Sequence, residues 1–163
     1  MNRRGPSSAI GGYTLVELLV VLAVTAVLAT LAAPMAEVAA QRDKERELKR
    51  ALWQIRDAID AYHDARKRGV IRGPASTSEW PPHLDSLAEP WPDARPGHEG
   101  EVVRFLRRVP RDPFADPLVP AARTWGLRSY RSNWSDPQPG DDVYDVYSRS
   151  AGVGLNGTAL SQW

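Results

Sequence analysis

Glu17 is the residue of this sequence that most clearly needs a partner, because its carboxylate is the only charge at the start of a long apolar run. Residues 18–36 are all apolar, small or threonine. Such a run approaches the ~20 residues that an α-helix needs to cross the hydrocarbon core of a membrane. A carboxylate that enters lipid without a partner costs roughly 2.5 kcal/mol or more. Something must therefore compensate the charge of Glu17, and its nature is the best clue to function.

Two common explanations of an apolar run account for only part of this segment. A secretory signal peptide has a shorter run of ~7–15 apolar residues, and its small-residue cleavage site follows that run. Here the small residues Gly11 and Gly12 precede the run. A plain membrane anchor explains the apolar residues, but it explains neither the glycines nor Glu17. Arg3 and Arg4 precede the run and favour a cytoplasmic N-terminus.

The start of this segment resembles that of type IV prepilins and pseudopilins. In that family the leader ends in glycine and the mature chain opens with an aromatic residue, then T-L-x-E; the matching residues are Gly12, Tyr13, Thr14, Leu15, Val16 and Glu17. Pro34 stands where the family places a helix-kinking proline. The resemblance implies that a membrane prepilin peptidase cuts between Gly12 and Tyr13 and methylates the new N-terminal amine.

Processing of this kind would supply the cation that Glu17 needs. After cleavage Tyr13 carries a positive amine at the lipid boundary, and the Glu17 of a neighbouring subunit can pair with it. Low dielectric strengthens such a pair, and removal of one partner typically costs ~3–5 kcal/mol. We therefore interpret Gly12 and Tyr13 as processing residues, and Glu17, Tyr13 and Pro34 as assembly residues. The alternative for Glu17 is an interfacial acid that reaches the lipid headgroups.

The helical pattern continues beyond the apolar run. The apolar residues are spaced by three and four, which predicts a single stripe on a charged helix; they are Leu48, Leu52, Ile55, Ile59 and Tyr62. Lys67, Arg68 and Gly69 provide a cationic last turn and a helix stop. One helix from about Thr14 to Arg68 would be about 80 Å long, with a kink at Pro34. We expect a C-terminal sheet to cover the stripe; a coiled-coil partner is the alternative.

Residues 70–100 are dense in proline, glycine and serine and predict a long surface loop. Within it we expect one helical turn around residues 83–87, and Trp80 and Trp91 as its anchors to the body. Residues 102–106 look like a short helix that Pro110 ends. The following proline–aspartate–proline–aromatic group resembles a pseudopilin turn that closes onto the sheet; its residues are Pro110, Asp112, Pro113 and Phe114.

Two segments rich in aromatic and β-branched residues, 125–132 and 143–150, predict an antiparallel pair of strands. A small sheet packed on the long helix is the natural arrangement. The expected fold is therefore α+β and type IV pilin-like. The chain end, with residues 144–148 and Trp163, resembles that of the type II secretion major pseudopilin. The expected divisions are a leader (1–12), a transmembrane and assembly half of the helix (13–36), its periplasmic half (37–69) and a head (70–163).

Calcium binding is a family property that the sequence supports weakly. Calcium-binding pseudopilins follow the corresponding strand with an aspartate–glycine turn and further aspartates, whereas no carboxylate follows Asp145 here. Calcium takes ~6–8 oxygen ligands. Asp141, Asp142 and Asp145 are the available candidates, and their commoner role is that of turn and strand-edge residues. We expect no cofactor and no confident metal site, and we expect Trp163 and backbone bonds to hold the tail on the sheet.

Other chemical signals are weak. Gly152, Gly154 and Gly157 fit a dinucleotide-binding pattern, but too few residues follow to complete that unit. The histidines show no metal-ligand spacing among themselves, and no serine lies in a nucleophile elbow. The 163 residues carry a formal charge of +1 and no cysteine, so we expect neither a nucleic-acid partner nor a disulfide. We expect no enzyme activity.

These observations favour a pseudopilin of a type II secretion system, anchored by a single span in the inner membrane with its head in the periplasm. The resemblance implies a homopolymeric filament that drives protein export. It also implies several partners, namely minor pseudopilins, the prepilin peptidase, an inner-membrane platform protein and an assembly ATPase. The alternatives are a type IV pilus subunit and a minor pseudopilin or monomeric membrane-anchored module.

Overall fold

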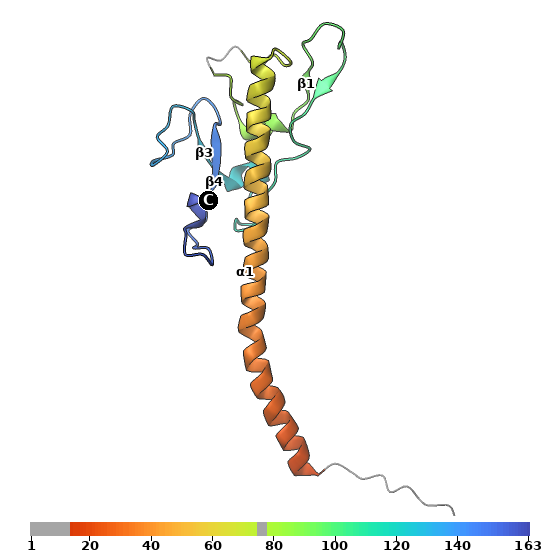
Figure 1. The fold of residues 1–163 in the computed structure, drawn as a ribbon, viewed down its shortest axis with the longest axis vertical. Helices are drawn as coiled ribbons and strands as arrows, with labels where there is room; N and C mark the ends of the chain where they lie inside the picture. The colour runs from red at the N-terminus through yellow and green to blue at the C-terminus, as the bar shows by residue number, and fades with distance from the viewer. Residues whose placement is uncertain (1–13, 75–77) are drawn as a thin grey trace, which may run out of the picture. The chain divides into compact units, whose positions relative to one another are not determined.

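The computed structural model describes residues 14–74 and 78–163, except for the side chains of residues 30–34. The fold is α+β, as predicted (Figure 1). The chain divides into an N-terminal unit, Met1–Ala40, and a C-terminal unit, Gln41–Trp163. The elements in chain order are α1 (Leu15–Lys67), η1 (Leu84–Leu87), β1 (Trp91–Pro92), β2 (Val102–Val103), η2 (Ala121–Thr124), β3 (Trp125–Arg128), β4 (Asp145–Ser148) and η3 (Leu160–Gln162).

Helix α1 has the bounds that the sequence predicts, and within the C-terminal unit its apolar stripe forms the centre of the core. The five stripe residues are all buried and contact apolar side chains of the loops and strands; they are Leu48, Leu52, Ile55, Ile59 and Tyr62. The helix ends at Lys67, and Gly69 just beyond it has a left-handed φ of 69°. The Val70 amide donates to the Ala65 carbonyl and the Gly69 amide to the Arg66 carbonyl, which is a Schellman end.

Strands β3 and β4 pair antiparallel, with Trp125 opposite Ser148 and Arg128 opposite Asp145. Both strands are shorter than the sequence predicts. The Ser129 amide donates instead to the Gln138 carbonyl, and the Tyr130 amide donates to the Asp142 carboxylate. The chain therefore leaves the ladder after Arg128, because its next amides are bonded within the connecting loop.

The aspartate of the proline-rich turn, which comprises residues 110–114, lies inside the C-terminal unit. Asp112 is 1% exposed. Its carboxylate accepts hydrogen bonds from the Ser148 hydroxyl at 2.6 Å and from the Phe114 amide at 2.8 Å. The Trp125 indole donates to the Pro110 carbonyl at 2.8 Å. The turn therefore closes onto both strands of the sheet, in agreement with the prediction.

The segment before this turn differs from its prediction. Residues 102–106 do not form a helix: Val102 and Val103 are strand β2, which pairs antiparallel with β1. The amides of Phe105 and Leu106 both donate to the Leu87 carbonyl, so this backbone is bonded to remote residues instead of to its own next turn. β-branched valines suit such an extended pairing.

The proline-rich loop is attached to α1 by its two predicted anchors. The Trp80 ring stacks on His63 with 3.7 Å between centroids, and Trp91 meets Tyr62 edge-on at 5.4 Å. The helical turn expected at residues 83–87 is present as η1. Strand β1, which lies within this loop, was not predicted from the sequence.

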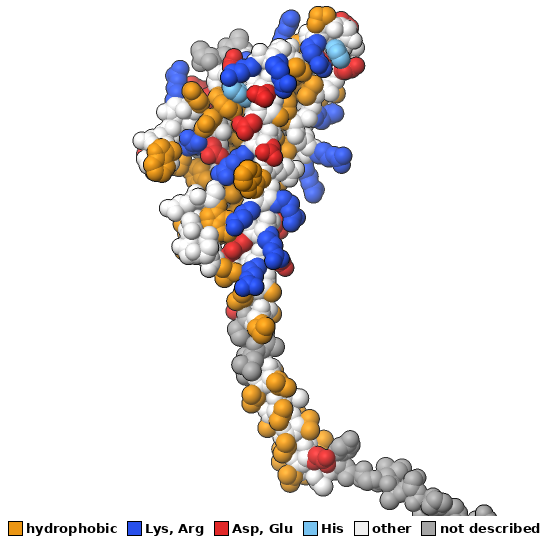
Figure 2. All heavy atoms as spheres, in the orientation of Figure 1, with side chains coloured by type: hydrophobic (Ala, Val, Ile, Leu, Met, Phe, Trp, Pro, Cys, Tyr) orange, Lys and Arg blue, Asp and Glu red, His pale blue; other side chains and the backbone are white. Residues whose placement is uncertain are grey.

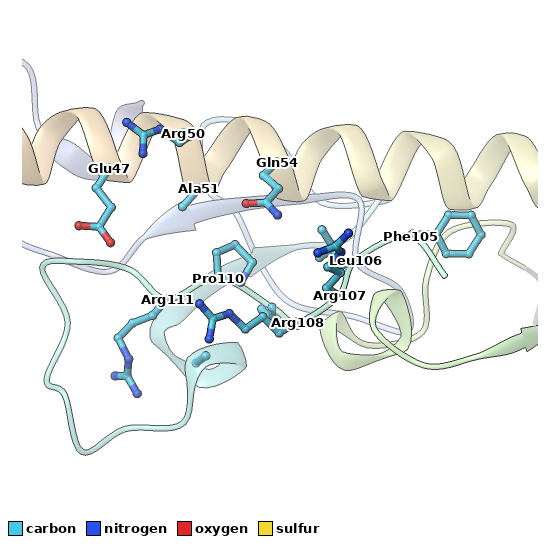
Figure 3. Close-up of a pocket in the computed structure, with 12 residues that line it drawn as sticks. Glu47, Arg50, Ala51, Gln54, Phe105, Leu106, Arg107, Arg108, Pro110 and Arg111 are labelled. Carbon is cyan, nitrogen blue, oxygen red and sulfur yellow. The ribbon is translucent and has the colours of Figure 1, made fainter. Parts of the chain in front are cut away.

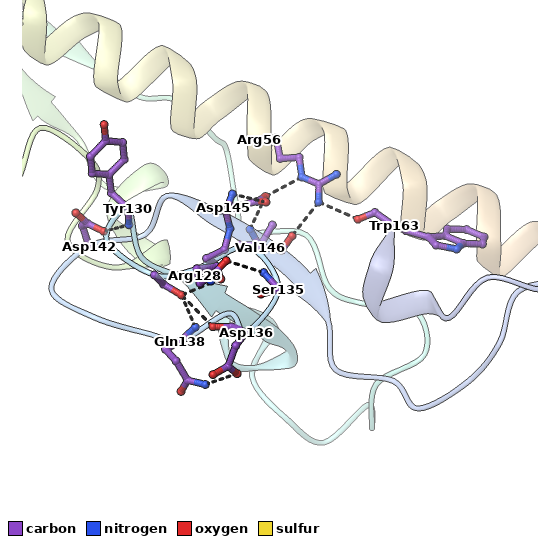
Figure 4. Close-up of polar contacts among 12 residues, drawn as sticks. Arg56, Arg128, Tyr130, Ser135, Asp136, Gln138, Asp142, Asp145, Val146 and Trp163 are labelled. Atoms are coloured by element: carbon purple, nitrogen blue, oxygen red, sulfur yellow. Dashed lines mark hydrogen bonds and ion pairs between the residues drawn. The ribbon is translucent and has the colours of Figure 1, made fainter.

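The C-terminal tail is bonded to α1 as well as to the sheet (Figure 4). The Arg56 guanidinium donates to the Trp163 carbonyl at 2.9 Å, to the Val146 carbonyl at 3.1 Å and to Asp145 at 2.8 Å. The Lys49 ammonium lies 4.3 Å from the centroid of the Trp163 ring. Trp163 thus docks against α1 and not only on the sheet, because a cationic helix face meets its ring and its carbonyl.

Candidate functional site

Helix α1 begins with a cap at Thr14 that was not predicted from the sequence. The Thr14 hydroxyl accepts a hydrogen bond from the Glu17 amide at 3.3 Å. Thr14 and Glu17 thus have the spacing of a capping box, in which a threonine caps the helix and a glutamate follows three residues later. A carboxylate in the first turn also interacts favourably with the positive end of the helix dipole. The T-x-x-E pattern is the signal that would have revealed this cap.

The helix surface after this cap is apolar on all sides, and no other described residue of the chain covers it. Every large apolar side chain from Leu15 to Leu28 is exposed, with exposed fractions from 53% at Val24 to 74% at Leu15. Figure 2 shows hydrophobic side chains over the visible face of this segment, with an acidic one near its start. The Thr25 hydroxyl donates to the carbonyls of Val21 and Leu22. A helix that is apolar all round requires lipid or other protein around it.

Glu17 is the one charged side chain on this apolar segment. It is exposed, and within the described residues its carboxylate forms no ion pair. Once the surrounding helix is covered, this carboxylate requires a cation or hydrogen-bond donor from outside the described part of the chain. An N-terminal amine of a second subunit has the right charge for that role.

Of the remaining predicted assembly and processing residues, two lie outside the described part of the chain and one is described by its backbone alone. Gly12 and Tyr13 lie outside the described residues. The backbone of Pro34 lies within α1, but its side chain is not described, so the predicted kink stays a prediction. Among the described residues, no helix is both long and apolar enough to count as a membrane span.

The three aspartates considered for calcium lie in different surroundings. The Asp142 carboxylate accepts hydrogen bonds from the Ser78 hydroxyl and from the Tyr130 amide. The Asp145 carboxylate accepts from Arg56 at 2.8 Å and from Arg128 at 3.3 Å. Asp141 is exposed. Two of the three carboxylates therefore already serve the packing of the loop and the tail, and the expected weakness of calcium binding stays a prediction.

A different cluster of ligating side chains lies at the end of the β1–β2 hairpin, and the sequence analysis did not detect it. Within the described residues, Asp93, His98 and Glu101 place one ligating atom each within 4.8 Å of one another. Arg95 already binds both oxygens of Asp93. Its hydrogen bond is the main reason that the pKa of Asp93 is lowered to about 2. The cluster therefore closes the hairpin loop through the Arg95–Asp93 ion pair and a contact of 2.9 Å between His98 Nδ1 and a carboxylate oxygen of Glu101.

Comparison with known proteins identifies one part of the chain. Residues 8–33 match the prokaryotic N-terminal methylation motif. No curated protein and no solved structure matches the chain. The matched segment contains Gly12, Tyr13 and Glu17, so it covers the predicted processing site and the start of the apolar helix. The chain therefore carries an N-terminal methylation motif, the prepilin signal of type IV pilin-like proteins, and this motif indicates a structural subunit of the pilin-like or pseudopilin kind.

Proposed function

We propose that the chain is a pseudopilin subunit of a type II secretion system, which polymerises through the first part of α1 into a periplasmic filament that drives protein export. The observation that carries this proposal is the uncovered apolar surface of α1 with the lone carboxylate of Glu17 at its start. The burial of one large apolar side chain contributes about 1.5–3 kcal/mol. Lipid already covers these side chains before assembly, so this energy does not itself drive helix packing in the bilayer; it keeps the segments packed together once they leave the membrane.

In the proposed pathway the subunit first lies in the inner membrane as a single-pass protein, with residues 13–36 in the bilayer and the C-terminal unit in the periplasm. The leader, residues 1–12, is removed by the prepilin peptidase. The methylated amine of Tyr13 then pairs with Glu17 of a neighbouring subunit as the helices pack. Minor pseudopilins, the platform protein and the assembly ATPase act on the growing filament from the membrane.

Processing is the first testable step of this proposal. Mass spectrometry of the protein from peptidase-competent cells should show an N-terminus at Tyr13, carrying a methyl group. Gly12→Leu should leave the leader attached, because the peptidase would have to hold a branched side chain beside the scissile bond, where glycine presents none. Gly11→Leu is the matched control and should be processed. An intact N-terminus at Met1 in the unsubstituted protein would contradict the proposal.

The choice of secretion over a surface pilus rests on the proline-rich turn, whose buried Asp112 closes onto β4, and on the absence of cysteine. Deletion of the gene should abolish export of secreted proteins without loss of surface fibres. Long surface fibres at native expression, lost on deletion, would favour a type IV pilus subunit instead.

A further inference from the structure

One groove of the C-terminal unit is lined by arginines. It encloses about 830 Å³ between α1 and the segment of residues 105–111. Figure 3 shows Arg107, Arg108 and Arg111 on that segment, with Glu47 and Gln54 on the helix beside it. We call this the arginine groove. Its walls belong to two elements of the same compact unit.

The guanidinium groups of this groove lack anionic partners. Among the described residues, Arg50, Arg107 and Arg108 form no ion pair and no side-chain hydrogen bond, and all three are exposed. Arg111 donates to the Asp116 carbonyl at 2.8 Å, which leaves its charge uncompensated. Glu47 is the single acid in the lining. Arginine presents a planar fork of donors that matches a carboxylate, so the groove suits an acidic partner.

The exposed face of α1 carries an acidic stripe of complementary charge. Asp57, Asp60 and Asp64 are spaced by three and four residues, so they lie on one side of the helix, and all three are exposed. Within the described part of the chain their carboxylates form no ion pair. Like charges at this spacing destabilise a helix. Trp53, 67% exposed, lies beside them on the same face.

The two surfaces cannot meet within one chain, because both include the same helix. At 3.6 residues per turn, the groove residues of α1 and the acidic stripe are centred roughly a quarter turn apart. In the proposed filament the contact is heterologous: the groove of one subunit meets the stripe of the next. A heterologous contact that does not close into a ring produces an open filament.

We propose that the arginine groove of one subunit binds the acidic stripe of α1 in a second copy of this chain. Arg107 and Arg108 pair with Asp57 and Asp60, and Trp53 packs against the guanidinium planes. This inference rests on the proposed function, because it names the contact between C-terminal units that accompanies packing of the apolar helices. The partner is a second copy because the chain itself supplies the complementary charge.

Disulfide cross-linking tests the contact directly, because the chain has no cysteine of its own. Full-length Asp57→Cys and Arg108→Cys proteins are produced together in cells and oxidised in intact membranes. We expect a disulfide-linked dimer in at least about tenfold excess over the matched pair Asp85→Cys and Arg108→Cys, since proximity raises the effective concentration. Asp85 is an exposed acid outside the stripe. Equal yields from the two pairs would overturn the proposal.

Charge reversal supplies a second measurement that does not depend on cysteine geometry. Arg107→Glu/Arg108→Glu and Asp57→Arg/Asp60→Arg should each lower the amount of filament by at least about tenfold, because like charges would meet across the contact. When both variants are produced together, much of the lost filament should be restored. Arg149→Glu changes an exposed arginine elsewhere and should have no effect. Loss without any restoration would overturn the pairing.

The outcomes separate this inference from the proposed function. Filaments that depend on Glu17 but show no specific cross-link would refute the contact and leave the proposed function intact. A specific cross-link in a protein that forms no filament would support the contact and refute the proposed function. Binding of duplex DNA that Arg107→Glu/Arg108→Glu abolishes, without the cross-link, would assign the groove to a nucleic acid instead.

Discussion

Asp112 should be one of the most sensitive positions of the C-terminal unit, because its buried carboxylate joins the proline-rich turn to strand β4. Asp112→Ala removes the acceptor of two hydrogen bonds, one from the Ser148 hydroxyl and one from the Phe114 amide. Ser148 is fully buried, so water does not replace the lost acceptor. Each hydrogen bond to a charged group contributes about 1.5–3 kcal/mol. For the two bonds together, we therefore expect the free energy of unfolding to fall by about 3–6 kcal/mol.

The measurement is urea unfolding of the compact unit of residues 41–163, followed by tryptophan fluorescence. The loss should appear as a lower midpoint with an unchanged slope, because the surface exposed on unfolding stays the same. Asp112→Asn keeps an acceptor for the Phe114 amide, so its free energy of unfolding should fall by less than that of Asp112→Ala. Asp116→Ala is the matched control: its carboxylate accepts one exposed bond from the Leu118 amide, so we expect a loss within about 1 kcal/mol.

A double-mutant cycle with Ser148→Ala isolates the bond between the turn and the strand. The two substitutions should be non-additive, because both remove the same hydrogen bond. If Asp112→Ala costs no more than Asp116→Ala, or if its effect adds fully to that of Ser148→Ala, then the carboxylate does not hold the turn on the sheet and the reasoning is wrong.

Two further predictions concern ions. The melting temperature of residues 41–163 should change little between excess chelator and millimolar calcium, because an ion stabilises the protein only when its concentration exceeds its Kd for the folded state and because Asp142 and Asp145 are already bonded within the protein. A large rise that Asp142→Ala abolishes would show that a site exists. The pKa of Asp93 is lowered from 3.8 to about 2, chiefly by its hydrogen bond from Arg95, so its stabilisation is complete above pH 3.8 and is lost as the pH falls towards 2. Between pH 3.8 and 2 the free energy of unfolding should therefore fall more steeply with decreasing pH for the wild type than for Asp93→Asn. The same pH dependence in both proteins would refute a stabilising role of the Asp93–Arg95 pair.

The long helix and its buried stripe were predictable because a helix displays its periodicity locally. The positions from Leu48 to Tyr62 repeat at three and four residues, and all five stripe residues are buried. The helix stop at Gly69 follows from residue type for the same reason, since glycine adopts a left-handed φ readily. The turn at Asp112 was predicted through a resemblance and not through periodicity, and the burial of its carboxylate was not predicted.

The features that the sequence did not reveal depend on residues far apart in the chain. Strand β2 has two residues, and its pairing is with Trp91 and Pro92, so no local alternation identifies it. Arg56 joins α1 to β4 and to the last residue of the chain, and nothing in its neighbourhood in the sequence marks it. The cluster around Asp93 forms because a hairpin brings Glu101 back beside it.

The most direct test of the central claim is the assembly of Glu17 variants. Glu17→Gln keeps a residue type that suits the third position of a capping box but removes the charge. Glu17→Gln and Glu17→Ala should both insert into the membrane and be cleaved before Tyr13. Filaments counted by electron microscopy of overproducing cells should be lost or strongly shortened in both variants, because the amine of Tyr13 no longer meets a carboxylate. Filaments of normal number and length from processed Glu17→Gln protein would contradict the account.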